Sequence, residues 1–279
     1  MNIAQALALR GELDSYERQE NAWLLQHILD MDVLRLKISS DIELSPAQQQ
    51  AYVEGLARIE AGEPLAYVTG TQPFWTLELK VTPDTLVPRP DTEVLVEQVL
   101  QLPLAADARV VDLGTGTGAI ALSLASERPQ WQVLATDIYA PTLAVAAENA
   151  QTHALTQVKF LCSAWYDAFA AAEIEKFDLI VSNPPYIDAE DVHMQDLKAE
   201  PRRALVADQQ GMADLERIIQ QGRAWLKSGG WMALEHGYQQ GQAVRQVFEQ
   251  AGFSQIATGK DYAGNDRISW AQYNDSDKA

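Results

Sequence analysis

Apolar positions along the chain predict two regions with different architectures. Up to about residue 70, apolar residues recur at helical spacing, as in Ile3–Leu13 and Tyr16–Leu29. A further helix is expected to begin at Ser45-Pro46, because serine is a favourable N-cap and proline fits the first helical position. We therefore predict a small N-terminal helical bundle over residues 1–70. It carries no evident catalytic residue, so a partner-docking module and a structural appendage both remain open.

Residues 71–86 have the character of a linker. Thr76–Val81 alternates polar and apolar side chains, which indicates a β-strand, and we predict a β-hairpin in this linker. A helix is expected to follow and to run to about residue 102, with Asp91 or Thr92 as its N-cap.

From residue 109 onward, short apolar strands alternate with helical segments. Strands are expected at Val110–Leu113, Gln132–Thr136, Val158–Leu161, Phe177–Val181, Trp231–Glu235, Ser254–Thr258 and Arg267–Tyr273. Helices are expected at Ala119–Ser126, Pro141–Ala154, Met212–Leu226 and Gln239–Ala251, and a long loop at 187–210. This alternation predicts an α/β domain over residues 87–279 with a doubly wound, mostly parallel seven-stranded sheet. The last two strands have a short link and are expected to pair antiparallel.

Composition narrows the class of protein. The chain has 279 residues, 47% of them hydrophobic, and no apolar run approaches the roughly 18–20 residues of a membrane span. The single cysteine, Cys162, excludes an internal disulfide and favours a reducing compartment, so we expect a cytoplasmic protein with no membrane partner. The formal net charge of −18 disfavours stable nucleic-acid binding. The four histidines are scattered, and we expect no metal site.

A glycine-rich loop after the first strand of the α/β region is a candidate ligand site. Its residues are Gly114, Thr115, Gly116, Thr117 and Gly118. Glycine lets the backbone turn tightly and lets a ligand approach it closely. Asp137 ends the next strand, where a carboxylate can accept hydrogen bonds from both ribose hydroxyls.

Trp165 follows the third strand and either covers an adenine ring or packs in the core. Gly114-x-Gly116-x-x-Ala119 also satisfies the relaxed dinucleotide fingerprint, so a nicotinamide- or flavin-binding module is an alternative.

A second candidate site follows the fourth strand, at Asn183-Pro184-Pro185-Tyr186. Proline has no N–H, so Pro184 and Pro185 contribute carbonyl acceptors without donors. The Asn183 carbonyl oxygen adds another acceptor, and Tyr186 adds a flat apolar face. Such a rim suits a planar group that carries N–H donors, whereas an oxyanion would require donors. Methyl transfer to an NH₂ group has a use for this rim and hydride transfer has none.

Together the two motifs, Asp112 to Gly118 and Asn183 to Tyr186, resemble those of class I S-adenosylmethionine-dependent amino-methyltransferases. More narrowly, the chain resembles the peptide chain release factor glutamine methyltransferases, the PrmC/HemK family. The matching segments are Glu63 to Gly70, Phe74-Trp75, Leu86 to Glu93, Glu200-Pro201 with Ala204-Leu205, and Leu234 to Gly237. The family's N-terminal Arg-x-Asp-Ala-Glu-x-Leu-Leu run is only partly present, at Arg18 to Leu25.

The resemblance implies the cofactor S-adenosyl-L-methionine and a protein substrate, the glutamine of a Gly-Gly-Gln loop in class I peptide chain release factors. Asn183, Pro184 and Tyr186 are then the expected catalytic residues, and Pro185 joins them in binding the substrate. The side-chain oxygen of Asn183 and the carbonyl of Pro184 would each accept one amide N–H, while Tyr186 packs on the amide plane. The cofactor is expected to contact the loop from Gly114 to Gly118, Asp137, Trp165 and Asn183.

Three questions remain open from the sequence. A nucleic-acid adenine methyltransferase would use the same Asn-Pro-Pro-aromatic rim, although the acidic charge argues against it. Glu235 and His236 end a strand and are candidates for a general base or for a structural pairing. Arg89 is held on a stiff loop, where it either reaches the mouth of the active site or pairs with a carboxylate.

Overall fold

The structure is a computed structural model that describes residues 1–191, 194 and 197–275. The chain divides into two compact units, Met1–Thr71 and Gln72–Ala279, so the division lies one residue beyond the predicted end of the bundle. The predicted β-hairpin linker belongs almost wholly to the larger unit. Among the described helices, none is long and apolar enough to cross a membrane. No group of three or more potential metal ligands occurs in the same described residues.

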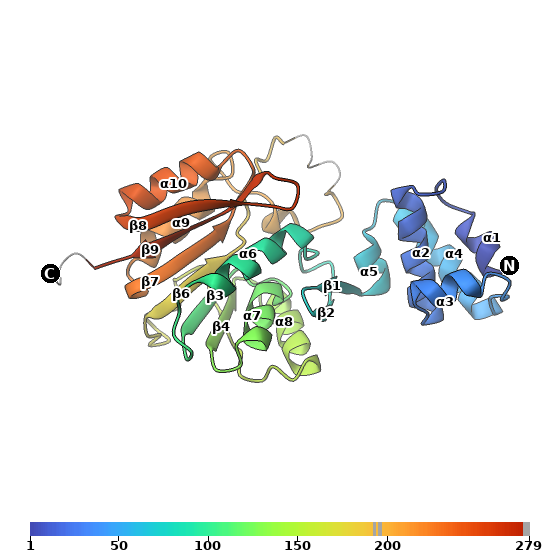
Figure 1. The fold of residues 1–279 in the computed structure, drawn as a ribbon, viewed down its shortest axis with the longest axis horizontal. Coiled ribbons are helices and arrows are strands. Elements are labelled where there is room, and N and C mark those ends of the chain that lie inside the picture. The colour runs from blue at the N-terminus through green and yellow to red at the C-terminus, as the bar shows by residue number, and fades with distance from the viewer. Residues whose placement is uncertain (192–193, 195–196, 276–279) are drawn as a thin grey trace. The chain divides into compact units, whose positions relative to one another are not determined.

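The smaller unit is a bundle of short helices, drawn in blue in Figure 1. They are α1 (Ile3–Leu7), α2 (Tyr16–Leu29), α3 (Val33–Ile38), α4 (Pro46–Glu60) and α5 (Leu65–Thr69). The expected bounds of α2 are confirmed, and Ser45 caps α4 in a capping box with Gln48. The expected extension of the first helix to Leu13 is wrong. Gly62, Pro64 and Gly70 predict a loop between α4 and β1. Packing of Ala66 and Tyr67 instead stabilises the single turn of α5 in this segment.

A buried polar contact ties three segments of this bundle together. The Tyr52 hydroxyl lies 2.7 Å from the Ala6 carbonyl oxygen and 2.6 Å from Oδ1 of Asn21, and the Tyr52 ring is fully buried. Asn21 in turn donates to the carbonyls of Ala6 and Leu7. The single hydroxyl proton is therefore shared between two buried acceptors that have no access to water.

The larger unit begins with a two-stranded hairpin of β1 (Thr71–Phe74) and β2 (Leu77–Lys80), followed by α6 (Pro90–Gln101). Its main sheet has seven strands in the order β5-β4-β3-β6-β7-β9-β8 (Figure 1). The strands are β3 (Arg109–Leu113), β4 (Gln132–Asp137), β5 (Lys159–Cys162), β6 (Phe177–Ser182), β7 (Leu226–Glu235), β8 (Phe253–Lys260) and β9 (Asp266–Tyr273). All neighbours pair parallel except at β9, which is antiparallel to both β7 and β8. The predicted doubly wound, mostly parallel seven-stranded sheet is confirmed.

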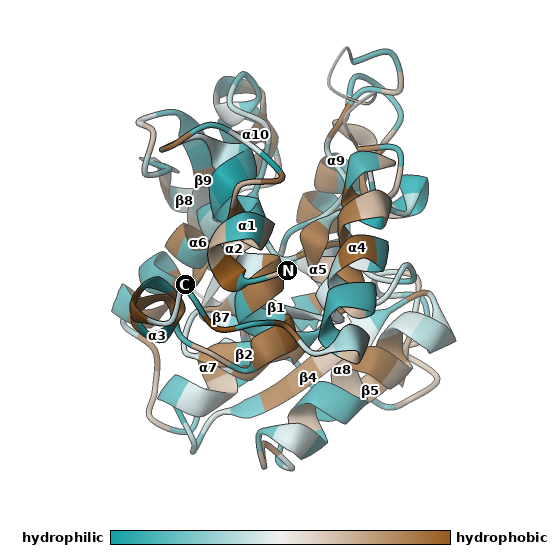
Figure 2. Ribbon diagram, turned by 90° about the vertical axis from the view of Figure 1, so that its right-hand side faces the viewer, coloured by the Kyte–Doolittle hydropathy of each residue, from teal (hydrophilic) through white to brown (hydrophobic). Residues whose placement is uncertain are grey.

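Helices cover both faces of this sheet. The connecting helices are α7 (Ala119–Glu127), α8 (Ala140–Thr152), α9 (Ala213–Gly222) and α10 (Gly241–Gln250). Side chains alternate between the faces, as strand geometry requires. Val110 and Leu179 pack in the core with residues of α6, α7 and α8, whereas Val111 and Ile180 pack with residues of α9 and α10. Figure 2 shows hydrophobic residues in brown along β4.

The start of α6 differs from the sequence-based expectation. Asp91 and Thr92 do not cap the helix; Arg89 is the N-cap, without a side-chain cap bond, and Pro90 occupies the first turn. Proline has no N–H to satisfy, which removes part of the need for a cap. The long loop expected at 187–210 contains a short 3₁₀ helix, η2 (Arg202–Ala204), and residues 192, 193, 195 and 196 of it lie outside the described residues.

Tyr52→Phe should destabilise the smaller unit by about 1–3 kcal/mol, because the buried acceptors at Ala6 and Asn21 lose the hydroxyl proton that they share. Hydrogen exchange of the amides in α2 and α4 measures this opening free energy locally in the full chain. Tyr16→Phe is the matched control, since the Tyr16 side chain is exposed. Equal protection in both variants would show that the buried hydroxyl contributes nothing.

Candidate active site

The two candidate motifs lie side by side because of the order of the strands. The chain runs from β3 outward through β4 to β5 and then returns to β6 on the other side of β3, which makes a topological switch point. Leu113 pairs with Ser182 across β3 and β6, and the Ser182 hydroxyl donates to the Leu113 carbonyl at 2.6 Å. The glycine-rich loop and the Asn183 motif therefore leave neighbouring strands at the same edge of the sheet.

A pocket of about 310 Å³ opens at this edge. Six of the residues predicted from the sequence line it: Gly114, Gly116, Asp137, Trp165, Asn183 and Pro185. Thr115, Thr117, Gly118, Pro184 and Tyr186 are not among its lining residues. The structure thus brings the cofactor and substrate motifs to one pocket, although five of their residues are not part of its lining.

Residues outside the pocket lining shape the glycine loop. Gly114, Gly116 and Gly118 all have positive φ, the region that glycine enters without strain. Thr115 is buried and donates its hydroxyl to Oδ2 of Asp112 at 2.6 Å. The same oxygen of Asp112 accepts the Ala121 N–H at the start of α7. Burial raises the pKa of Asp112 to about 7, against these hydrogen bonds.

Asp137 ends β4 with its carboxylate held by the backbone. One oxygen accepts the Gly116 N–H at 3.2 Å, and the other accepts the Tyr139 N–H at 3.0 Å. Burial raises the pKa of Asp137, and these two backbone donors act in the opposite direction. The carboxylate is thereby fixed at the pocket wall with lone pairs left for a ligand's hydroxyl groups.

Trp165 forms another wall of the pocket. Its indole N–H donates to Oδ1 of Asp214 at 3.1 Å, and its backbone has a φ of +52°. Gly114 lies beside the indole, where a β-carbon would make ordinary van der Waals contact with the ring at 3.4 Å. The backbone φ of +71°, rather than the space beside the ring, favours glycine at position 114.

Sequence reasoning missed several residues of this pocket. Asp214 from α9 lines it, and so does Arg203 from the long loop. The Arg203 guanidinium stacks 4.5 Å from the ring centroid of Tyr139 and donates to the Asp84 carbonyl at 3.1 Å. No spacing or motif in the sequence marks these residues, because they come from segments far apart in the chain.

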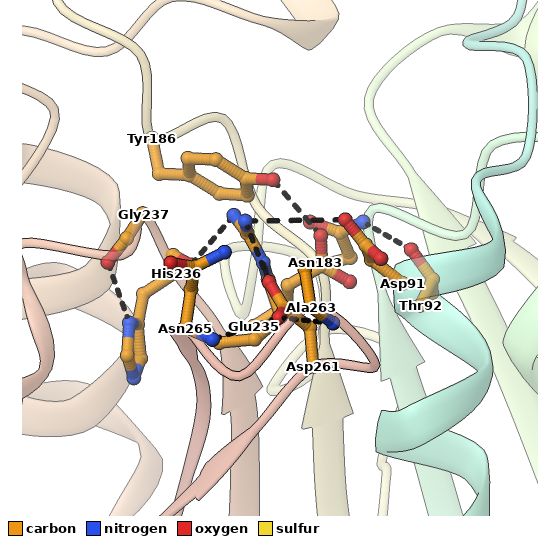
Figure 3. Close-up of polar contacts among 11 residues, drawn as sticks. Asp91, Thr92, Asn183, Tyr186, Glu235, His236, Gly237, Asp261, Ala263 and Asn265 are labelled. Atoms are coloured by element: carbon orange, nitrogen blue, oxygen red, sulfur yellow. Dashed lines mark hydrogen bonds and ion pairs between the residues drawn. The ribbon is translucent and has the colours of Figure 1, made fainter.

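The orientation of the Asn183 side chain is fixed by α6. Its Nδ2 donates to the Thr92 hydroxyl at 3.1 Å, as Figure 3 shows. Within the described part of the chain, neither Oδ1 of Asn183 nor the Pro184 carbonyl oxygen accepts a hydrogen bond from the protein. Both oxygens are thus available to an N–H donor from a ligand.

Tyr186 is held at both ends. Its hydroxyl donates to Oε1 of Glu235 at 2.9 Å, and its carbonyl accepts the side-chain N–H of Gln240 at 3.0 Å. Gly211 packs on the same carbonyl, where a β-carbon would be only 2.0 Å from the oxygen. Burial beside the Glu235 carboxylate raises the pKa of Tyr186, so this hydroxyl remains protonated.

His236 and Arg89, whose roles the sequence leaves open, both make contacts within the protein. His236 is buried, with Nε2 2.8 Å from the Ser269 hydroxyl and Nδ1 2.9 Å from the Gly237 carbonyl oxygen. Burial lowers the pKa of His236, which favours the neutral ring. Arg89 forms an ion pair with Glu200, whose side chain is almost fully buried. These contacts are those of a structural pairing.

The fold and pocket define a class of protein, and comparison with known proteins agrees. Residues 90–263 match the methyltransferase small domain, and residues 3–70 match the PrmC N-terminal domain. A methyltransferase structure from Pyrococcus furiosus has the same fold, with a TM-score of 0.53, 18% identity and coverage of 80% of this chain and 99% of that one. The larger unit is therefore a class I methyltransferase domain.

Individual relatives identify the family within this class. The release factor glutamine methyltransferase of Salmonella typhimurium is 46% identical over 258 residues, which is 92% of each chain. That of Aliivibrio fischeri is 44% identical over 276 residues, or 96% of this chain and 94% of the relative. The chain belongs to the release factor glutamine methyltransferase family.

Asp137→Asn should weaken binding of S-adenosylhomocysteine by roughly tenfold or more, because a charged acceptor is replaced by a neutral one. Titration calorimetry measures the dissociation constant directly. Asp107→Asn is the matched control, since Asp107 lies on the exposed surface. Unchanged affinity in Asp137→Asn would contradict the assignment of this carboxylate to the ligand.

Proposed function

We propose that this chain transfers the methyl group of S-adenosyl-L-methionine to the side-chain amide nitrogen of the glutamine in the Gly-Gly-Gln motif of class I peptide chain release factors. The observation that carries the proposal is the orientation of Asn183. Its Nδ2 is bonded to Thr92, so its Oδ1 is left to accept an amide N–H at the wall of the pocket. The names of the curated relatives support the same substrate.

The residues that line the pocket offer the groups that S-adenosylmethionine would need. The Asp137 carboxylate would accept the ribose hydroxyls, and the Trp165 indole would cover the adenine ring. The glycines at 114 and 116 leave room for the ligand beside the loop backbone. The bound cofactor supplies an electrophilic methyl group on a sulfonium. The protein's task is then to place a weak nucleophile in line with that methyl group.

Substrate positioning falls to Asn183, Pro184 and Tyr186. An amide nitrogen is a poor nucleophile because its lone pair is delocalised into the carbonyl. Oδ1 of Asn183 and the Pro184 carbonyl would each accept one N–H, and this fixes the direction of the nitrogen. Tyr186 would pack on the amide plane, and Pro185 lines the pocket beside it. Orientation of this kind supplies up to about 7–11 kcal/mol in well-aligned systems.

The acidic charge of the chain favours a protein substrate over a nucleic acid. A net charge of −18 repels phosphate backbones, so the adenine methyltransferase alternative is disfavoured. We propose a cytoplasmic location, which the single cysteine and a translation-factor substrate support, and we propose no stable nucleic-acid or membrane partner.

Asn183→Ala should lower kcat on the order of 10²–10³-fold, because one of two substrate acceptors is removed from the transition state. The affinity for S-adenosylhomocysteine should change much less. Asn274→Ala serves as the matched control, since Asn274 is exposed and bonds only to Ser254 among the described residues. Full turnover by Asn183→Ala would rule out the assigned role.

The substrate itself is tested by incubating the chain with radiolabelled S-adenosylmethionine and a purified class I release factor. Label should enter the wild-type factor and not a factor whose Gly-Gly-Gln glutamine is replaced by alanine. Equal labelling of both factors, or of neither, would overturn the proposed function.

A further inference from the structure

A carboxylate from α9 lies at the polar edge of the Trp165 indole. Asp214 is in the first turn of α9, and its Oδ1 accepts the indole N–H at 3.1 Å. Both side chains are half-buried, and both line the pocket. The other oxygen of Asp214, Oδ2, accepts no hydrogen bond from the protein within the described part of the chain. An acceptor with free lone pairs is thus left at the pocket wall.

The indole beside this acceptor is held in a fixed position. Trp165 has a φ of +52°, a conformation that residues other than glycine adopt rarely and keep only where their surroundings fix it. The Ser163 hydroxyl donates to the Trp165 carbonyl at 2.9 Å and accepts the Ala168 N–H at 3.1 Å. The six-membered ring lies beside Gly114, and the N–H on the other ring bonds to Asp214. The wall is therefore a fixed plate with a carboxylate at its edge.

A planar ligand that stacks on this plate would bring its own edge toward the same carboxylate. The two oxygens of a carboxylate are adjacent, and each has lone pairs. One oxygen can hold the indole N–H while the other accepts a donor from the edge of the stacked ring. Adenine has such a donor in its exocyclic 6-amino group, whereas a purine with an oxygen at that position presents an acceptor.

The neighbouring side chains of the pocket do not offer this acceptor. Ala164 lines the pocket without a polar side-chain atom, and the Ser163 hydroxyl is committed to its two bonds. Arg217 also lines the pocket, but a guanidinium only donates. Burial raises the pKa of Asp214, while the Trp165 N–H and the charge of Arg217 act in the opposite direction. A carboxyl group keeps acceptor lone pairs in either protonation state.

We infer that Asp214 is a cofactor-binding residue that selects adenine by accepting a hydrogen bond from the 6-amino group at Oδ2. The same carboxylate holds the Trp165 indole through Oδ1, so the ring that covers the base and the acceptor that recognises it are fixed to each other. The inference rests on the proposed function, in which the pocket binds S-adenosylmethionine with its adenine on Trp165. It adds the group that distinguishes adenine from other purines.

A comparison of two ligands tests this assignment without a release factor. The first ligand is S-adenosylhomocysteine, and the second is its analogue in which hydrogen replaces the 6-amino group. Titration calorimetry on the full chain gives both dissociation constants. The wild-type chain should bind S-adenosylhomocysteine on the order of tenfold more tightly, because the analogue leaves Oδ2 of Asp214 without its donor.

Asp214→Asn should remove this preference. Its side-chain oxygen still accepts the Trp165 N–H, so its NH₂ replaces Oδ2 and meets the 6-amino group with a donor. S-adenosylhomocysteine should then bind roughly tenfold more weakly, with little change for the analogue, and the ratio of the two constants falls toward one. Asp208→Asn is the matched control and should keep the wild-type ratio. Asp208 is an exposed carboxylate close enough to raise the pKa of Asp214, but it does not line the pocket.

A role confined to holding Trp165 predicts that Asp214→Asn weakens both ligands equally and leaves their ratio unchanged, and that outcome overturns the inference. Asp214→Ala removes both oxygens and should also abolish the preference, so it gives the same test if the asparagine variant does not fold. Tight binding of S-adenosylhomocysteine by the wild-type chain without a preference refutes the role of Asp214 alone. Binding of neither ligand refutes the cofactor, and with it both the proposed function and this inference.

Discussion

The hydrogen bond from Asn183 to Thr92 is the constraint on which the chemistry of this site depends. It joins the end of a central strand to the first turn of α6, two segments that lie 91 positions apart in the chain. An asparagine side chain has a donor end and an acceptor end of nearly equal size, so shape alone does not choose between them. The hydrogen bond from Nδ2 to Thr92 makes this choice, and it decides whether the pocket wall offers an acceptor or a donor to an NH₂ group.

The sheet provides the rigid frame for this contact. β3 and β6 are neighbours although β4 and β5 lie between them in the sequence, so their loops converge at a switch point. Motifs on strand ends are positioned by the ladder itself, which leaves little freedom at their first residues. In the proposed function, this frame would let two short loops place a sulfonium methyl donor and a planar amide in one line.

Much of this arrangement could be predicted from the sequence. The strands have strong apolar patterns, which predict the fold. Glycine and proline mark the two loops by their backbone properties, so Gly114, Asp137, Trp165 and Asn183 could be predicted as residues of the pocket. Thr92 was expected as a helix cap, because serine and threonine near a helix start usually serve that role. Its actual partner, Asn183, lies just beyond the end of β6 and far away in the sequence, and no local rule contains that information.

The same limit applies to Glu235, Arg203 and Asp214. A carboxylate at a strand end, such as Glu235, could be a base, an ion-pair partner or a hydrogen-bond acceptor, and only its neighbours in the fold decide among these roles. Arg203 and Asp214 reach the pocket only through tertiary packing. The sequence thus predicts which loops carry the chemistry, whereas the groups that orient those loops become visible only in three dimensions.

The most direct test of the central claim is a crystal structure of the chain with S-adenosylhomocysteine and a peptide containing Gly-Gly-Gln. The account predicts the glutamine amide nitrogen within about 3.2 Å of both Oδ1 of Asn183 and the Pro184 carbonyl oxygen, pointing toward the cofactor sulfur. A glutamine amide bound elsewhere, or an Asn183 side chain that turns its nitrogen toward the peptide, would contradict it.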